Sequence, residues 1–119
     1  MSITLYGIKN CDTVKKARKW LDSHDINHNF HDVRIDGLPE VLLDQWIAEL
    51  GWETLLNRRG TTWRQQPDEI KTSIDSSSAR ALMLEFPAII KRPVLETPVQ
   101  RHVGFKEADY LHIFKNQTS

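Results

Sequence analysis

The stretch that decides the fold runs from residue 3 to residue 17 and reads ITLYGIKNCDTVKKA. Its first four residues suit a short buried strand, and Val14, Ala17 and Leu21 recur at helical spacing. Cys11, the single cysteine among 119 residues, therefore lies where a strand passes into a helix. Unpaired backbone N–H groups and the positive end of the helix dipole meet there, and both stabilise a thiolate.

The alternative for Cys11 is a small buried hydrophobe, which is the commoner role of a lone intracellular cysteine. Its neighbours Lys9, Asn10, Asp12 and Thr13 are polar, which places the sulfur outside an apolar core. We therefore expect a reactive thiol. One cysteine allows no intramolecular disulfide, so a fold that depends on disulfides is excluded and the reducing cytoplasm is the expected location.

The length and composition predict one domain spanning residues 1–119, without nucleic-acid or membrane partners. The 16 basic and 16 acidic residues cancel, so net charge recruits neither nucleic acid nor anionic lipid. A basic cluster at residues 15–19 is most simply the solvated face of a helix. The sequence shows no secretory leader and no apolar window long enough to span a membrane.

The order of predicted elements points to one fold class. A strand over residues 3–6, a helix over 12–23 and a strand over 27–33 have the length of a right-handed parallel crossover. Residues 88–95 regain β character around Pro93, which is a candidate for a cis peptide bond. A short strand over 103–105 and a helix over 106–114 complete the pattern. An α/β thioredoxin-like fold fits this order best, with a mixed sheet flanked by helices.

The middle of the chain, about residues 38–87, is predicted to be a largely helical insertion within that domain. Pro39 and Pro67 suit the first position of a helix, and Ser77 or Ser78 is expected to cap the last helical piece. The expected pieces are residues 41–50, a turn over 53–57, a helix from Pro67, and a helix that ends at Phe86 before Pro87.

Two arginine-bearing segments are candidates for a site around Cys11. One is residues 55–64, LLNRRGTTWR, and the other is residues 91–93, KRP. Arginine presents a forked set of donors to carboxylates and oxyanions, and a guanidinium near Cys11 would also lower the pKa of the thiol. Lys9 is a further candidate cation. The five histidines lack the partners of a metal site, so no metal is expected.

Val14 stands where a Cys-x-x-Cys motif would have its second cysteine. Cys11 therefore has no resolving thiol within the chain. If it is redox-active, a thiol from outside must close its catalytic cycle.

Residues 6–13, 57–64, 91–94 and 103–105 together resemble the arsenate reductase (ArsC/Spx) family, most closely its small YffB branch. The resemblance covers residues 3 to about 114 and implies a thioredoxin-like fold. It implies that Cys11 is the nucleophile and that Arg92, before a cis-proline, binds the substrate. For the loop arginine, simple alignment indicates Arg58, whereas the Arg-Gly-Thr-Thr pattern favours Arg59. The predicted substrate-binding residues are Lys9, Asn10, Arg58, Arg59, Arg92 and Pro93.

The function expected from this resemblance is a glutathione-dependent thiol oxidoreductase. It would hold no bound cofactor, use glutathione as co-substrate, take a small anionic substrate and act as a monomer. One alternative is an arsenate reductase coupled to glutathione and glutaredoxin; such enzymes carry a third arginine, for which Arg101 is the nearest candidate. Another is an Spx-like regulator that contacts RNA polymerase, although Val14 removes the usual Cys-x-x-Cys switch.

Overall fold

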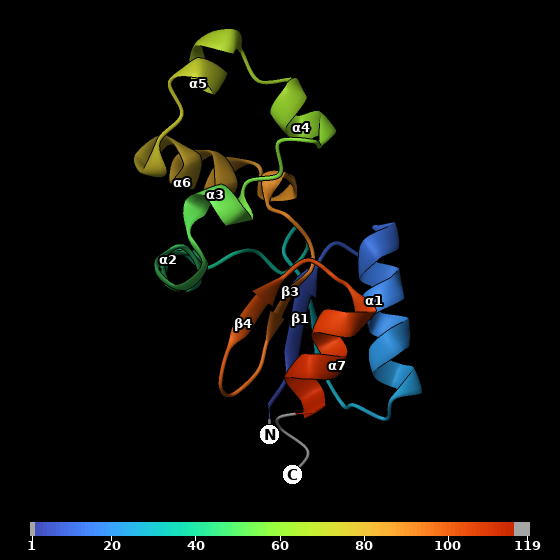
Figure 1. Ribbon diagram of the computed structural model, residues 1–119. Coiled ribbons are helices and arrows are strands. Elements are labelled where there is room, and N and C mark those ends of the chain that lie inside the picture. The colour runs from blue at the N-terminus through green and yellow to red at the C-terminus, as the bar shows by residue number, and fades with distance from the viewer. Residues whose placement is uncertain (1, 116–119) are drawn as a thin grey trace.

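The computed structural model describes residues 2–115, in which a four-stranded sheet carries helices on its faces and a helical segment at one end (Figure 1). The elements are β1 (Thr4–Gly7), α1 (Asp12–Ser23), β2 (Asn29–Asp32), α2 (Glu40–Leu50), α3 (Trp52–Leu55), α4 (Thr61–Arg64), α5 (Asp68–Thr72), α6 (Ser76–Glu85), a 3-10 helix (Pro87–Ile89), β3 (Val94–Glu96), β4 (Arg101–Val103) and α7 (Glu107–Lys115).

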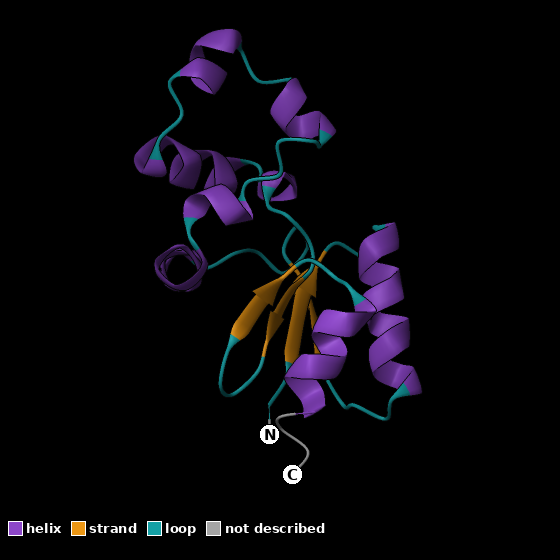
Figure 2. Ribbon diagram, in the orientation of Figure 1, coloured by secondary structure: helices purple, strands orange, loops and turns teal. Residues whose placement is uncertain are grey.

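The sheet is mixed and has the strand order β2-β1-β3-β4. β1 and β2 run parallel and are connected through α1, whereas β1–β3 and β3–β4 are antiparallel pairs. A parallel β-α-β unit joined to a β-hairpin and a final helix is the thioredoxin-like arrangement. Figure 2 shows the four strands as one twisted layer, with α1 and α7 packed beside each other along it. The predicted α/β fold is confirmed.

One face of the sheet is covered by α1 and α7. Leu5 on β1 lies opposite Leu95 on β3, and both side chains are fully buried. They belong to one apolar cluster with Val14, Ala17 and Tyr110 from the two helices. Because side chains alternate across a strand, the neighbours of Leu5 point to the other face. This packing fixes the start of α1, and therefore Cys11, against the end of β1.

The other face packs against the helical segment. Tyr6 meets the indole ring of Trp46 on α2 edge to face, with ring centroids 5.1 Å apart. A second apolar cluster joins Val94 on β3 to buried residues of the helices, among them Leu55 and Met83. The helical segment extends away from the sheet, which makes the molecule about 48 Å long and 26 Å wide. Within residues 2–115 no helix is long and apolar enough to cross a membrane.

The prediction of β structure over residues 88–89 is wrong. Residues 87–89 form a 3-10 helix, because Pro87 occupies its first turn and its ring fixes φ in the helical range. The chain becomes extended only at Ile90, where it bridges Leu56 rather than a strand of the sheet. The apolar residues of this stretch are buried, as a strand would be, but against the helical segment.

Smaller predictions shift by one to three residues. The final strand is Arg101–Val103, because Gly104 adopts a φ of +87° and turns the chain where a strand was expected to continue. The cap of α6 is Asp75 rather than a serine at 77 or 78, and Ser78 is instead its partner in a capping box. Pro39 and Pro67 lie at the N-cap, one residue before the positions predicted for them.

Candidate active site

Cys11 is the N-cap residue of α1, with an extended backbone at φ −111° and ψ 125°. Its carbonyl accepts the first hydrogen bond of the helix from the Lys15 N–H at 2.9 Å. The tight approach of β1 to α1 requires a glycine at residue 7, because a Cβ there would lie 2.7 Å from a Val14 methyl group. These contacts hold the half-buried sulfur where the chain passes from β1 into α1.

The environment of Cys11 favours the thiolate. Burial raises the pKa of the thiol, but the backbone N–H of Val14, the Arg92 guanidinium and the backbone N–H of Thr13 outweigh it, so the net pKa lies below its ordinary value. The N–H groups belong to the first turn of α1, so the helix terminus and one cation act on the same sulfur. A thiolate held in this way is the reactive form in disulfide exchange.

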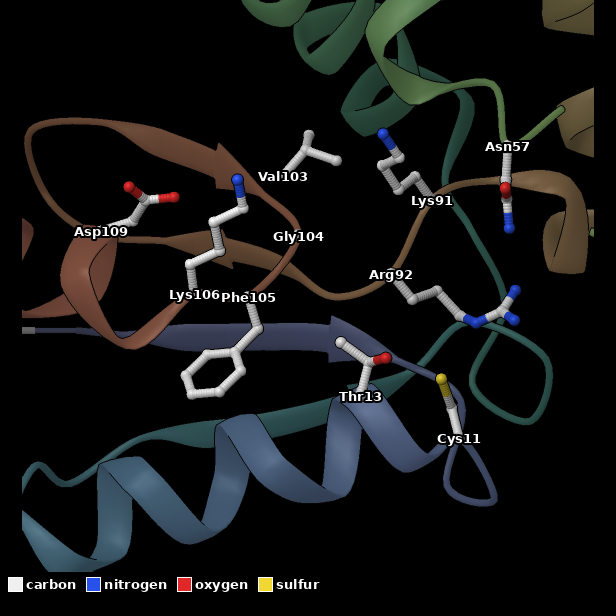
Figure 3. A pocket seen from close by; sticks show the side chains of 10 residues that line it. All are labelled: Cys11, Thr13, Asn57, Lys91, Arg92, Val103, Gly104, Phe105, Lys106 and Asp109. Atoms are coloured by element: carbon white, nitrogen blue, oxygen red, sulfur yellow. The ribbon is translucent and has the colours of Figure 1, made fainter. Parts of the chain in front are cut away.

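Arg92 is held by the segment that precedes it. Its Nη1 donates to the carbonyl oxygens of Ala88 and Ile90. The guanidinium is therefore positioned by the 3-10 helix and by the residue that follows it. The Arg92–Pro93 peptide bond is cis, as expected from the sequence. The Nε atom is buried and has no hydrogen-bond partner within the described part of the chain. Arg92 therefore has an N–H donor that remains available beside Cys11 (Figure 3).

Cys11 and Arg92 line the same open cavity of about 480 Å³, which is large enough for a small-molecule ligand (Figure 3). α1 supplies one wall, the β4–α7 connection a second, and the segment before Pro93 together with the loop after α3 the third. The lining residues are Cys11, Thr13, Asn57, Lys91, Arg92, Val103, Gly104, Phe105, Lys106 and Asp109.

Backbone hydrogen bonds bring the two arginine-bearing segments side by side. The Asn57 N–H donates to the Ile89 carbonyl at 2.9 Å, and the Lys91 N–H donates to the Leu55 carbonyl at 2.7 Å. A third bond, from the Gly104 N–H to the Pro93 carbonyl at 2.8 Å, joins the β4–α7 connection to the same segment. Three parts of the chain that are distant in sequence are thereby fixed around one sulfur.

The loop arginines do not line the cavity. Arg58 is exposed, and its guanidinium lies 5.6 Å from the ring centroid of Trp63. Arg59 is also exposed, and its backbone N–H donates to the Asn57 side chain at 3.1 Å. The loop residue that reaches the cavity is Asn57, which sequence reasoning missed although it opens the Asn-Arg-Arg-Gly motif.

Lys91 and Lys106 also line the cavity and were not predicted as site residues. Both are exposed at its rim, where their charge is available to a ligand. Each directly adjoins a predicted site motif, Lys91 before Arg92 and Lys106 after residues 103–105. That adjacency was the signal that could have identified them. Arg101, by contrast, is bound to Glu96 and Glu49 on the other side of the hairpin and does not line the cavity.

Lys9 and Asn10 do not line the Cys11 cavity but line a second cavity together with Asp32. The buried Asp32 carboxylate accepts the Lys9 N–H at 2.9 Å and further N–H groups from Arg34 and Ile35. Burial raises the pKa of Asp32, but these N–H donors outweigh it and the pKa lies below its ordinary value. The carboxylate thereby ties the loop that carries Cys11 to the end of β2.

Within residues 2–115, histidine, cysteine and carboxylate side chains form no group of three that could hold a metal ion. The groups that the site does offer are a thiol whose pKa is lowered, backbone N–H donors and cations. Such a site suits nucleophilic attack by sulfur on a ligand that carries negative charge.

Fold and site together define a thioredoxin-like protein with a single free cysteine at the start of its first helix. Residues 6–113 match the model of the ArsC family, and the chain belongs to that family. It is 46% identical, over 94% of its length and 98% of the relative, to a Haemophilus influenzae protein described as uncharacterised. More distant relatives include the global transcriptional regulator Spx of Streptococcus agalactiae, 26% identical over 88% of this chain and 77% of the relative.

Two solved structures are similar over nearly the whole chain. A protein named YffB has 48% identity and a TM-score of 0.89, with 93% of this chain and 97% of that chain covered. An arsenate reductase (ArsC) related protein from Brucella melitensis has 51% identity and a TM-score of 0.80, with 97% and 96% covered.

Proposed function

We propose that this ArsC-family protein is a glutathione-dependent thiol oxidoreductase whose nucleophile is the Cys11 thiolate. The observation that carries the proposal is the shared cavity in which Arg92 and the first turn of α1 both act to lower the pKa of Cys11. Cations at the rim suit a thiol that bears carboxylates, and glutathione is such a thiol. The proposal places the protein in the reducing cytoplasm as a monomer without a bound cofactor.

The reaction would proceed through a mixed disulfide, because Val14 leaves Cys11 without a second thiol. The Cys11 thiolate attacks the glutathione sulfur of a glutathione mixed disulfide. A bond forms between Cys11 and glutathione, the original disulfide bond breaks, and the other thiol leaves as its thiolate. A second glutathione thiolate then attacks the mixed disulfide, which releases Cys11 and glutathione disulfide. The net reaction exchanges one disulfide for another: one free glutathione thiol is consumed, and its sulfur pairs with the glutathionyl sulfur that came from the substrate.

The remaining predicted residues have places in this proposal. Lys9 and Asn10 would contact the part of the disulfide that leaves, since they directly precede Cys11 in the chain and line a separate cavity. Arg59 and Arg58 are exposed beside Asn57 and would meet a substrate that extends beyond the cavity.

The test is intact-mass measurement after incubation with oxidised glutathione at neutral pH. The wild-type protein should gain one glutathionyl group, which added reduced glutathione removes, and Cys11→Ser should gain none. A wild-type protein that stays unmodified would overturn the proposal.

Arsenate reduction is a second candidate, favoured by the 51% identity to a protein described as arsenate reductase related. The engagement of Arg101 with two glutamates argues against it, because that arginine is the nearest candidate for the third cation of such enzymes. Arsenate-dependent consumption of reducing equivalents, in an assay with glutathione and glutaredoxin, would support this candidate over the first.

An Spx-like regulatory role is a third candidate, favoured by the relatives of that name. Binding of the purified chain to purified RNA polymerase, measured by co-sedimentation, would support it. Absence of binding at micromolar concentrations would remove it.

A further inference from the structure

Two hydrogen-bond donors face each other across the cavity beside the Cys11 sulfur. Figure 3 shows the amide nitrogen of Asn57 pointing toward the guanidinium of Arg92, with Cys11 next to that guanidinium. An amide N–H and a guanidinium N–H cannot hydrogen-bond to each other. An acceptor oxygen placed between them would satisfy both.

The orientation of the Asn57 amide follows from its neighbours. Its Oδ1 accepts the backbone N–H of Arg59 at 3.1 Å, so the other end of the amide, Nδ2, must be the end that is free to donate. A side chain at residue 60 would crowd that end, because a Cβ on Gly60 would lie 3.0 Å from Nδ2. The backbone N–H of Asn57 is bonded to Ile89, which anchors the residue itself.

The guanidinium of Arg92 is also held in place, and not all of its N–H donors have a hydrogen-bond partner in the described residues. Nη1 donates to two backbone carbonyls, which holds the guanidinium in place. Nε is buried, and no acceptor in the described residues reaches it. Burial keeps Nε out of reach of a ligand, so what the guanidinium offers a ligand is its charge, and no carboxylate in the described residues pairs with it.

The charges around the gap indicate how much negative charge the ligand carries. The cavity is lined by three cations, Lys91, Arg92 and Lys106, and by one carboxylate, Asp109, which lies beside Lys106 and also contacts His102 (Figure 3). With the Cys11 thiolate as a second negative charge, the lining keeps one positive charge in excess. Asn57 adds a donor but no charge. A single carboxylate matches this balance, whereas a tetrahedral dianion such as arsenate or sulfate exceeds it.

We propose that Asn57 is a specificity-determining residue which, with Arg92, binds one carboxylate of the thiol substrate and disfavours tetrahedral dianions. The inference rests on the proposed function and extends it by naming the recognised group. Asn57 donates one hydrogen bond through Nδ2, and Arg92 supplies the charge.

The experiment measures how S-methylglutathione, which cannot form a disulfide, protects Cys11 from alkylation by iodoacetamide. The protection constant is the concentration that halves the alkylation rate of each variant, so a change in the intrinsic rate cancels. Asn57→Ala should weaken protection about tenfold, the effect of one lost hydrogen bond. Asn57→Asp keeps the acceptor for Arg59 and replaces the donor by an anion, so it should weaken protection further. Arg64→Ala, at an exposed arginine that does not line the cavity, is the matched control and should stay within about twofold of wild type.

The outcomes separate the two proposals. If Asn57→Asp protects as well as wild type, the residue only shapes its loop and the inference is overturned, while glutathione use stands. If sulfate protects the wild-type protein as well as S-methylglutathione does, the preference for a carboxylate is overturned. If S-methylglutathione does not protect the wild type, the proposed function fails and the inference fails with it.

Discussion

The segment 57–60 and the segment 91–93 both bring arginine to the neighbourhood of Cys11, but the chain treats them differently. Arg92 is held by two backbone carbonyls and acts directly on the thiol. Arg58 and Arg59 are exposed, and only the amide of Asn57 reaches the cavity from their segment. An arginine can lower the pKa of a nucleophile when the backbone already holds its guanidinium in place. An exposed arginine becomes ordered only when a ligand binds it.

The largest effect is expected where the two segments share a support. Leu55 is fully buried, and its carbonyl accepts the Lys91 N–H, so it underlies both segments. Leu55→Ala should lower the free energy of unfolding by about 2–5 kcal/mol through lost burial and a cavity. Urea denaturation measures this, with the half-exposed Leu111→Ala as a control expected within about 0.5 kcal/mol of wild type. Equal effects of the two variants would contradict a shared support.

A smaller loss of stability is expected from replacing Asp32, which holds the loop before Cys11 by accepting the Lys9 N–H. Its folded-state pKa is lowered, so its contribution is present above the pKa of the unfolded chain and is lost as pH falls through the folded pKa. Asp32→Asn should cost about 1–3 kcal/mol at pH 7, since a buried N–H loses its acceptor. The difference from wild type should shrink below about pH 4.

Urea denaturation at pH 7 and pH 3 measures that difference. Asp22→Asn, at an exposed carboxylate near the end of α1, provides the comparison. A gap between wild type and Asp32→Asn that stays constant down to pH 3 would show that the carboxylate charge plays no part.

The thiol itself should distinguish the two arginine segments. Arg92→Ala should raise the pKa of Cys11 toward that of a free thiol and slow iodoacetamide alkylation at pH 7 about tenfold, because a cation that favours the thiolate is lost. Arg59→Ala should leave the pH profile of alkylation unchanged. If both variants shift the profile equally, the contrast between the segments does not hold.

The smallest effect concerns Arg58, which lies over Trp63 in an exposed cation–π contact. Arg58→Ala should lower the free energy of unfolding by about 0.5–1 kcal/mol without changing Cys11 reactivity. Thermal unfolding measures the stability, and alkylation of the folded protein from the same preparation measures the reactivity of Cys11. Arg58→Lys should recover part of the stability, and a change in alkylation rate would place Arg58 nearer the site than the structure does.

The sequence predicted the fold well because its signals are local. The apolar strand over residues 3–6, the helical spacing from Val14 and the turn at Gly51 each involve neighbouring residues, and their order leaves few topologies. The prediction failed where burial came from a distant partner. Ile89 and Ile90 have the apolar character of a strand, yet they are buried against the helical segment.

The site was predictable in part for the same reason. The position of Cys11 follows from the strand and helix that flank it, and Pro93 marks the segment that holds Arg92. The choice among Asn57, Arg58 and Arg59 depends on the backbone bond between Asn57 and Ile89, residues 32 positions apart. Sequence spacing carries no information about such a long-range bond.

The walls of the Cys11 cavity come from both parts of the molecule, α1 from the sheet layer and Asn57 from the helical segment. A ligand that fills it therefore binds only when the two parts are docked together. By mass action, a ligand at one hundred times its dissociation constant adds about 2.7 kcal/mol to the stability of that docked state. Amide hydrogen exchange in α6 should then slow when the cavity is occupied. Exchange in the helical segment would therefore detect binding of the thiol substrate at Cys11.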